Sequence, residues 1–503
     1  MSGIYLINRS VSGMLTTLNE RIAAFIDAIY ANPIERVVIT VLIIAGLYFT
    51  YKTRAVQLRL FPHMIKSMLK SRQNAHGGIS SFQAFTIGLA SRVGTGNIAG
   101  VAIAIVLGGP GSVFWMWVVA LIGMSTACME AILAQLFKVP ATDGTYRGGP
   151  AYYIEKGLGS RAWGKVFAVM LIFAFAFSFN MVQANTIAAV ATAAFGIKSW
   201  VVAIVLIVIS VPVIFGGIKK VARFAEVIAP IMAFAYIIMA IVIIGTNITE
   251  VPKIICIIFE GAFGFAQVSG GIIGGLIAAI SNGTKRGLFS NEAGMGSAPN
   301  AAATATVRHP VQQGLIQSLG VFVDTILVCT ATAFIVLLGG IYNVGDTSLT
   351  GAELTIRSMA NVLGSWTVIP MVIIIFVFGY SSVLGNYAYA EVNMDFLRGV
   401  NSSRLFLNII VVISVGLGSV MSLSAAWSLA DLFSGLMVVL NVFALFTLGK
   451  WALGALRDYE MQRKDIKDHG KEPLFISTDN EFMPGDLPSN EWTEETVSRR
   501  TGW

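Results

Sequence analysis

The chain has 503 residues, of which 55% are hydrophobic and only 12% are charged. Soluble globular proteins carry about 25% charged residues. This composition excludes an ordinary soluble protein and favours a chain that lies mostly within a lipid bilayer. The formal net charge of +7 does not indicate nucleic-acid binding, because the basic residues are spread between hydrophobic runs instead of forming one patch.

The N-terminal segment, residues 1–35, has no long apolar run beside a small-residue cleavage site, so we expect no cleaved signal peptide. Within it, residues 15–30 alternate between apolar and polar at helical spacing, which predicts an amphipathic helix at the membrane surface. A membrane span needs about 20 apolar residues. Eleven runs meet this need, at about 36–52, 79–107, 112–137, 163–195, 199–216, 222–245, 258–280, 311–340, 366–390, 405–422 and 424–449.

Basic residues in the connections predict the orientation, because Lys and Arg concentrate on the cytoplasmic side of a membrane protein. The first connection, 52–78, is rich in both, and placing it inside puts the N-terminus outside. Every second connection after it also carries basic residues, as does the polar region from about residue 454 onward. We therefore expect a multi-pass protein of the cell membrane with a cytosolic C-terminal tail that has little structure of its own.

Two spans are interrupted by glycine in a way that ordinary helix packing does not require. The second span contains Gly94, Gly96 and Asn97 near its middle, and the seventh contains a glycine-rich run at 265–275. With the first span set aside, these two open successive blocks of five spans, which is typical of transporters built from inverted repeats with broken helices. The alternative, that these are only packing glycines, stays open.

The predicted organisation follows from these two blocks. An extra transmembrane helix and a cytoplasmic loop occupy residues 36–78, and the tail occupies 451–503. Between them lie a first five-helix repeat at 79–245 and a second at 246–450.

A broken helix exposes backbone N–H and C=O groups that cost several kcal/mol each in hydrocarbon unless something replaces their partners. The N–H groups that open a half-helix attract a carboxylate, and the freed carbonyls attract a cation. A small neutral amino acid, which is a zwitterion, together with Na⁺ supplies both charges. We therefore expect these two as partners.

Polar residues within the spans are candidates for a binding site. In the fourth span, Asn180 and Gln183 are three residues apart and close to one helical face. In the ninth, Ser381, Ser382 and Asn386 interrupt an apolar helix, and adjacent hydroxyls are neutral oxygen donors suited to Na⁺. Simple bonding between helices, or of the serines to their own helix, is the alternative.

Four ionisable residues within or beside the spans need partners, because an unpaired charge is costly there. They are Arg92, Glu130, Asp324 and Asp431. We expect Arg92 to reach a carboxylate or the cytoplasmic side, and we favour a structural or gating ion pair over a direct contact with the substrate. A mechanism coupled to protons would need Glu130 and Asp324.

Four motifs together resemble the alanine or glycine:cation symporter family. They are GTGNIAG at 94–100, GGPAYYIEKGLG at 148–159, NMVQAN at 180–185 and KRGLFSNEAGMG at 285–296. The resemblance covers residues 36–450 with the motifs in order. It implies a leucine-transporter-like fold, in which one extra helix precedes two inverted five-helix repeats. It also implies symport of alanine, glycine or a related amino acid with Na⁺, or sometimes H⁺.

The resemblance assigns roles to residues of this chain. The stretch of Gly94, Thr95, Gly96 and Asn97 would bind the substrate carboxylate. The substrate site would be completed by Gln183, with Asn180 beside it, and by the second broken helix at Ser269, Gly270 and Gly271. Sodium symporters of similar fold imply Na⁺ near the carbonyls of Ala90 and Val93 and the hydroxyls of Ser381 and Ser382.

One position departs from the family pattern. Members that bind alanine can carry a tryptophan one turn after the hydroxyl pair, where this chain has Asn386. This departure puts alanine and glycine as sole substrates in doubt and adds Asn386 to the expected substrate-binding residues. A glutamine-selective or a proton-coupled symporter is the alternative. A channel or a polytopic membrane enzyme is disfavoured, because two broken helices suit alternating access and the sequence has no zinc or nucleophile motif. We expect no enzyme activity and no cofactor beyond Na⁺ as the coupling ion.

Overall fold

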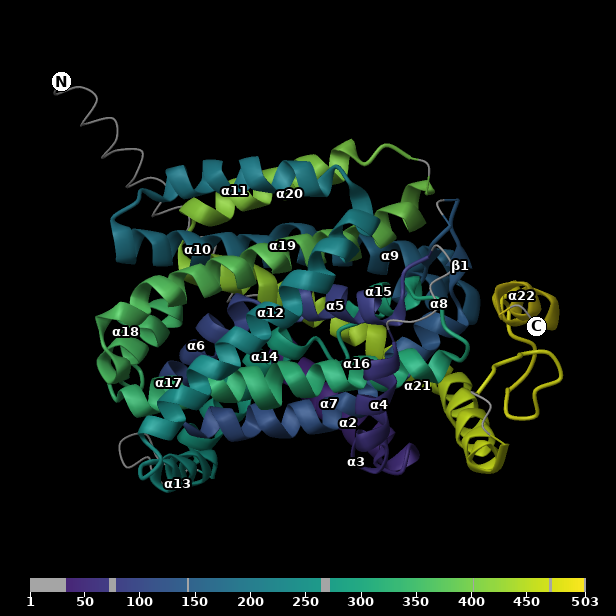
Figure 1. The fold of residues 1–503 in the computed structure, drawn as a ribbon, viewed down its shortest axis with the longest axis horizontal. Coiled ribbons are helices and arrows are strands. Elements are labelled where there is room, and N and C mark those ends of the chain that lie inside the picture. The colour runs from purple at the N-terminus through teal and green to yellow at the C-terminus, as the bar shows by residue number, and fades with distance from the viewer. Residues whose placement is uncertain are drawn as a thin grey trace.

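The computed structural model describes residues 33–71, 78–142, 144–263, 272–400, 402–469 and 473–501. Within these ranges the chain is almost entirely helical (Figure 1), with one antiparallel ribbon in which β1 (Val139–Pro140) pairs with β2 (Tyr146–Arg147). The predicted all-α class is confirmed. The segment 15–30, for which we expect a surface helix, lies outside the described residues.

The elements follow the predicted apolar runs in order. Those up to residue 262 are α2 (Pro33–Lys52), α3 (Val56–Arg59), α4 (Phe61–Lys70), α5 (Ser81–Arg92), η1 (Gly96–Gly100), α6 (Val101–Gly108), α7 (Gly111–Leu136), α8 (Pro150–Gly157), α9 (Arg161–Leu171), η2 (Ile172–Phe179), α10 (Asn180–Phe195), α11 (Ser199–Ile214), α12 (Gly217–Thr246) and α13 (Val251–Ala262). The later ones are α14 (Ile272–Asn291), α15 (Ala298–Thr304), α16 (Pro310–Val321), η3 (Phe322–Cys329), α17 (Thr330–Gly339), α18 (Gly351–Leu363), η4 (Ser365–Thr367), α19 (Val368–Arg398), α20 (Leu405–Val420), α21 (Leu423–His469), η5 (Asn490–Trp492) and α22 (Glu494–Thr501).

Six helices of the described chain are long and apolar enough to cross a membrane, and α5 with η1 and α6 forms a seventh candidate that is bent by 48°. The shorter apolar helices α11 and α20 also belong to the bundle. Large apolar side chains stay exposed on the outer helices; on α12 they include Ile231 and Phe234, exposed by 60% and 68%. A soluble protein does not leave such a surface in water. The fold is therefore that of a helical membrane bundle, and the count of eleven spans stays a prediction.

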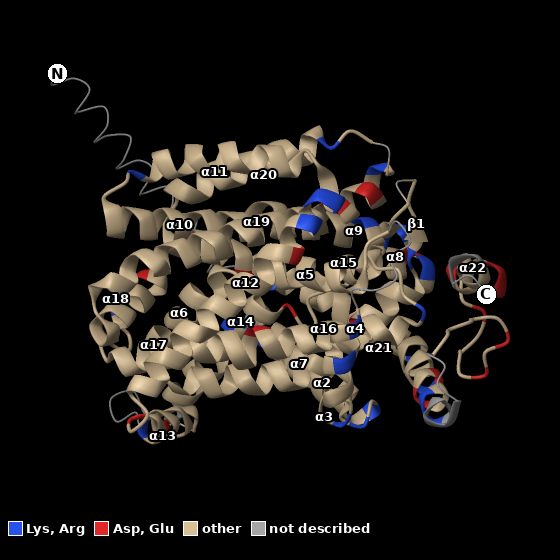
Figure 2. Cartoon of the chain, viewed as in Figure 1, with Lys and Arg blue, Asp and Glu red and all other residues tan. Residues whose placement is uncertain are grey.

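The helices run mainly along the long axis of the molecule (Figure 1). Helix α7 packs against α2, α14 and α16, while α19 packs against α5, α10 and α12. One end of the bundle carries α13 and α18, and the other carries α8, the β-ribbon and the C-terminal residues (Figure 1). We call the latter the tail end. Lys and Arg gather there, around α8, α9 and the last part of α21 (Figure 2).

A second helix break lies at 292–297, where the sequence does not predict one. Most of the predicted glycine run, residues 265–271, lies outside the described residues, so a break there stays a prediction. Residues 272–275 of the predicted glycine run belong to helix α14, and the chain leaves helical geometry only at 292–297, before α15 begins. The helix is interrupted there because Glu292, Gly294 and Gly296 have φ angles of 57°, 84° and 83°, which a right-handed helix cannot contain. Lys285 and Arg286 therefore lie inside helix α14, and not in a connection between two spans, as the predicted end of the seventh span at about residue 280 implies.

The expectation of a tail with little structure is wrong for the described residues. Helix α21 continues to His469, and residues 473–501 fold back against the tail end. Phe475 and Trp492 are fully buried there, and the Trp492 Nε1–H donates to the Gln135 carbonyl at 2.9 Å. Two aromatic anchors thus hold a segment whose polar composition alone indicates no fold.

Candidate functional site

The centre of the candidate site is the break between α5 and η1. Helix α5 ends at Arg92, and η1 begins at Gly96. A Cβ atom at Gly94 would lie 2.2 Å from the Ser382 Oγ and 3.1 Å from the Gln183 Oε1. Glycine at this position therefore allows α19 and α10 to approach the backbone of the break closely.

Two backbone N–H groups of the break are bonded to neutral side-chain oxygens. The Gly94 N–H donates to the Asn97 Oδ1 at 2.9 Å, and the Thr95 N–H donates to the Gln183 Oε1 at 3.0 Å. The Thr95 hydroxyl donates to the same Gln183 oxygen at 2.8 Å. The structure thus brings together Gly94, Thr95, Asn97 and Gln183, four of the residues that the sequence places in the substrate site.

The predicted cation residues are brought together only in part. The Ser382 hydroxyl donates to the Ala90 carbonyl at 2.9 Å and to the Phe378 carbonyl at 3.0 Å, so it connects α19 to the last turn of α5. The Ser381 hydroxyl donates to the Phe378 carbonyl at 2.9 Å and to the Met232 sulfur, without contacting the break. Val93 is fully buried and is the C-cap residue of α5.

Asn180 and Asn386 are fully buried and bond to each other. The Asn386 Nδ2 donates to the Asn180 Oδ1 at 2.9 Å, and its Oδ1 accepts from the Ser91 hydroxyl at 2.7 Å. A Cβ at Gly385 would lie 2.7 Å from the Ser91 nitrogen, which shows how closely α19 approaches α5. Both amides are therefore used in helix contacts beside the break.

Aromatic rings that the sequence reasoning missed border the break on its other side. A Cβ at Gly96 would lie 2.7 Å from the Phe289 Cδ1. The Phe289 ring stacks on Phe179 at 4.2 Å between centroids and lies 4.4 Å from the Trp427 ring. The sequence does indicate both positions, because Phe179 directly precedes the motif NMVQAN and Phe289 lies within the motif KRGLFSNEAGMG. Apolar walls with a few placed polar groups are typical of small-molecule sites.

Asp324 is joined to the same break. Its Oδ1 accepts from the Asn97 Nδ2 at 2.6 Å, and its Oδ2 accepts from the hydroxyls of Ser290 at 2.8 Å and Thr325 at 2.7 Å. Asn97 lies in η1 and Asp324 in η3, which are both π-helical segments. Such segments release carbonyls from the regular helical pattern. Here the Thr332 hydroxyl donates to the freed Asn97 carbonyl at 2.6 Å.

The remaining ionisable residues have different surroundings. Asp431 pairs with Arg286, whose guanidinium also lies 4.3 Å from the centre of the Trp427 ring. Arg92 is buried and donates to the Gln317 carbonyl at 3.2 Å, and no carboxylate in the described chain lies within ion-pair distance of it. The expectation of an ion pair for Arg92 is therefore not met in this structure.

The second break, at 292–297, contacts the first directly. The Ser91 hydroxyl donates to the Glu292 Oε1 at 2.8 Å, and the Ser297 hydroxyl donates to the Glu292 Oε2 at 2.7 Å. The predicted substrate contacts on the second broken helix, Ser269, Gly270 and Gly271, lie outside the described residues. Their roles stay predictions.

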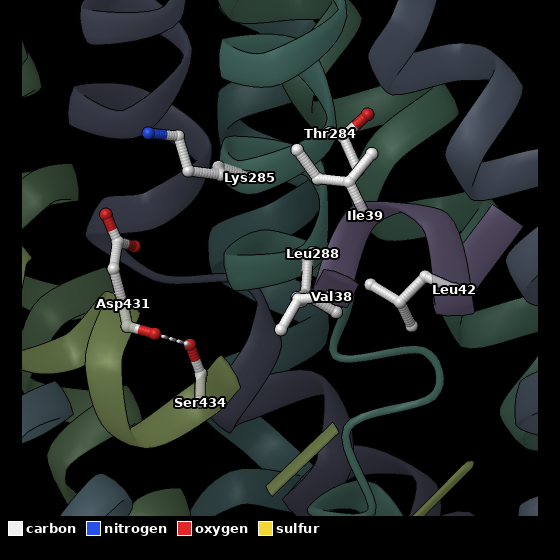
Figure 3. A pocket seen from close by; sticks show the side chains of 8 residues that line it. All are labelled: Val38, Ile39, Leu42, Thr284, Lys285, Leu288, Asp431 and Ser434. Carbon is white, nitrogen blue, oxygen red and sulfur yellow. Dashed lines mark hydrogen bonds between the residues drawn. The ribbon is translucent and has the colours of Figure 1, made fainter. Parts of the chain in front are cut away.

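A separate crevice lies between α2, α14 and α21 (Figure 3). Its lining residues are Val38, Ile39, Leu42, Thr284, Lys285, Leu288, Asp431 and Ser434. It contains none of the predicted substrate or cation residues. Its α2 side is apolar and its α21 side is polar, so it is a gap where α2 packs against α14 and α21 and not part of the break.

A bundle of long apolar helices with a polar, glycine-containing break at its centre defines a polytopic membrane protein of the transporter class. The profile of the sodium:alanine symporter family matches residues 19–473. The chain is 46% identical over 459 residues to an amino-acid carrier protein of Bacillus subtilis, covering 90% of this chain and 94% of the relative. It is 44% identical over 442 residues to the "Probable sodium/glutamine symporter" of the same species, covering 88% and 90%.

A third relative, a sodium/alanine symporter of Methanococcus maripaludis, is 38% identical over 427 residues, which cover 84% of this chain and 93% of the relative. The chain belongs to the sodium:alanine symporter family. It is accordingly a multi-pass membrane transport protein, as the sequence predicts, and the family is one of symporters and not of enzymes.

Proposed function

We propose that the protein is a secondary active transporter that uses a Na⁺ gradient to carry a small neutral amino acid into the cell by alternating access. The observation that carries this proposal is the break at Gly94–Asn97. The N–H groups of Gly94 and Thr95 are bonded to neutral amide oxygens, which a substrate carboxylate can replace with a gain in hydrogen-bond strength. Close by, Ser382 and the Ala90 carbonyl provide two neutral oxygens for a cation.

The proposed substrate site consists of Gly94, Thr95, Gly96, Asn97 and Gln183, with Asn180 and Asn386 beside it. The Phe179 and Phe289 rings supply its apolar wall. The proposed substrates are alanine and glycine, together with glutamine, which one relative carries in its name. For Asn386 to contact a longer side chain, its amide must exchange the bonds to Ser91 and Asn180 for bonds to the substrate.

The proposed architecture is one extra helix, α2, followed by two five-helix inverted repeats with the leucine-transporter-like arrangement. Both repeats would begin with a broken helix, namely α5 with η1 and α6, and α14 with α15. The tail end would face the cytoplasm, because the basic residues gather there (Figure 2). With α2 as an additional span, the N-terminus then lies outside.

Transport by purified protein in liposomes tests the proposal. An inward Na⁺ gradient at equal pH should drive accumulation of labelled alanine, glycine or glutamine above the external concentration, and replacing Na⁺ by K⁺ should abolish it. Uptake that ignores Na⁺ and follows a pH gradient would refute sodium coupling and point to Asp324, which is bonded to Asn97 in the break. Equilibration without accumulation would indicate a channel.

A further inference from the structure

The second helix break is filled by a carboxylate of the protein itself. Glu130, on α7, is buried, and its oxygens accept the backbone N–H groups of Gly294 at 3.1 Å and Gly296 at 3.0 Å. The Asn441 Nδ2, on α21, also donates to Glu130 and to the Gly294 carbonyl at 2.9 Å. The Tyr153 hydroxyl fixes the Asn441 amide by donating to its oxygen. The turn, α21 and α8 thus build the surroundings of one side chain of α7.

The backbone at this place is shaped to receive an anion. Gly294 and Gly296 both have positive φ angles, and a Cβ at either would lie within 2.9 Å of a neighbouring side chain. Successive N–H groups in such a turn converge, and this arrangement favours negative charge. Every group in the described chain that forms a hydrogen bond with the Glu130 carboxylate is a donor. A neutral carboxylic acid would have no acceptor for its proton among them.

The two breaks therefore differ in what holds their N–H groups. At the first, the acceptors are the amide oxygens of Asn97 and Gln183, which carry no charge. At the second, the acceptors are the two oxygens of a carboxyl group that belongs to the chain, and its hydrogen-bond partners in the described chain are all donors, which favours its ionised form. A substrate carboxylate can displace a neutral oxygen at the first break, whereas at the second it would meet a charge of its own sign.

We propose that Glu130 is a positioning residue for transport: it permanently occupies the backbone amides of the second break and so restricts the substrate carboxylate to the first. This inference rests on the proposed function, because it assigns the orientation of the amino acid in that same site. The ammonium group of the substrate then points toward the second break, on the side of Glu292, which contacts Ser91 of the first break. Glu130 holds the turn in place and does not carry a proton across the membrane.

Glu130→Gln tests the role with almost no change in shape. The variant amide turns one acceptor into a donor that faces the backbone N–H groups, so alanine uptake should fall by about tenfold or more. The pH profile of the remaining uptake should stay parallel to that of the wild type. Glu130→Asp, which keeps the charge, should retain more uptake than Glu130→Gln. Glu353→Gln is the matched control, because the Glu353 carboxylate is partly exposed and pairs with Arg357 at 2.6 Å.

Glu130→Ala provides a readout that does not depend on transport. The variant frees the amides of Gly294 and Gly296, so formate should raise its thermal unfolding midpoint, and formamide or chloride at the same Na⁺ concentration should not. Formate should also restore part of its alanine uptake and should leave the wild type and Glu353→Gln unchanged. If Glu130→Ala does not fold, the ranking of Glu130→Asp above Glu130→Gln decides.

Three results would overturn the inference. They are wild-type uptake by Glu130→Gln, a shifted pH optimum in that variant, and a formate effect on Glu130→Ala no larger than that of chloride. If instead the wild type shows no Na⁺-dependent uptake of any amino acid, the proposed function fails. Stabilisation of Glu130→Ala by formate would still establish the anion-filled break.

Discussion

Ser382→Ala is the perturbation that separates a cation ligand from an ordinary helix contact. The Ala90 carbonyl lies in the last turn of α5, and the Gly94 N–H that would close the next helical hydrogen bond donates to Asn97 instead. The Ser382 hydroxyl at 2.9 Å is the donor that satisfies this carbonyl. Removing it costs roughly 0.5–1.5 kcal/mol. If the same energy is lost from Na⁺ binding, the Na⁺ concentration for half-maximal uptake rises by about 2- to 13-fold.

Alanine uptake into proteoliposomes over a series of Na⁺ concentrations measures this effect. Ser381→Ala should give a smaller shift, because the Ser381 hydroxyl is bonded within α19 and to Met232. Ser414→Ala is the matched control, since that buried hydroxyl on α20 donates only to the Val411 carbonyl of its own helix, at 2.8 Å. An unchanged Na⁺ dependence in Ser382→Ala, with normal maximal uptake, would refute the placement of the cation between α5 and α19.

Three further predictions concern the break, its neighbours and the tail. Gly96→Val should abolish uptake, because the valine side chain would overlap the Phe289 ring, which packs against Phe179 and Trp427. The control Gly245→Ala should keep uptake, because the space around Gly245 is open. Asn386→Ala should lower the ratio of glutamine to alanine uptake by up to about tenfold, and an unchanged ratio with lower thermal stability would leave Asn386 a helix contact only. His309 contacts Phe475 of the tail, and burial lowers the pKa of His309. Protonation of His309, as the pH falls below about 6.5, therefore opposes the contact between His309 and the tail. Protease cleavage after His469 should therefore increase when the pH is lowered from 8 to 5.5. If the tail contact depends on neutral His309, the increase should be smaller in His309→Gln.

The helical bundle and the first break could be predicted from the sequence because both depend on local properties. Apolar runs of sufficient length form helices in a bilayer whatever surrounds them. The stretch at Gly94 places two glycines beside Asn97, whose side chain caps the broken helix itself at 2.9 Å. Short-range chemistry of this kind is visible in a single sequence.

The second break was missed because its cause is not local. The glycine run at 265–275 is more conspicuous than 292–297, yet its described part is helical. The turn at 292–297 needs the Glu130 carboxylate and the Asn441 amide, which come from two distant helices. The sequence shows Glu130 as a single buried acid, and nothing in its neighbourhood on α7 indicates which backbone it meets.

The orientation of neighbouring side chains was also beyond the sequence. Ser381 and Ser382 are adjacent and chemically identical, but successive residues on a helix point about 100° apart, so only one can face α5. Which one does so depends on the close approach of Gly385 to Ser91, a contact between helices far apart in the chain. The tail shows the same limit, because the burial of Trp492 depends on a carbonyl at the end of α7.

The direct contact between the two breaks explains why they would move together. The single Ser91 hydroxyl proton is shared between Glu292 at the second break and Asn386 on α19, whose oxygens lie 2.8 Å and 2.7 Å from the Ser91 Oγ. A displacement of the last turn of α5 must therefore break a buried bond to Glu292 or carry Glu292 with it. Glu292 would keep its bond to Ser297, but its Oε1 would lose the Ser91 donor, and a buried acceptor left without a partner costs about 1–3 kcal/mol, so joint movement is favoured. In alternating access, an amino acid bound at the first break would thus alter the second without touching it.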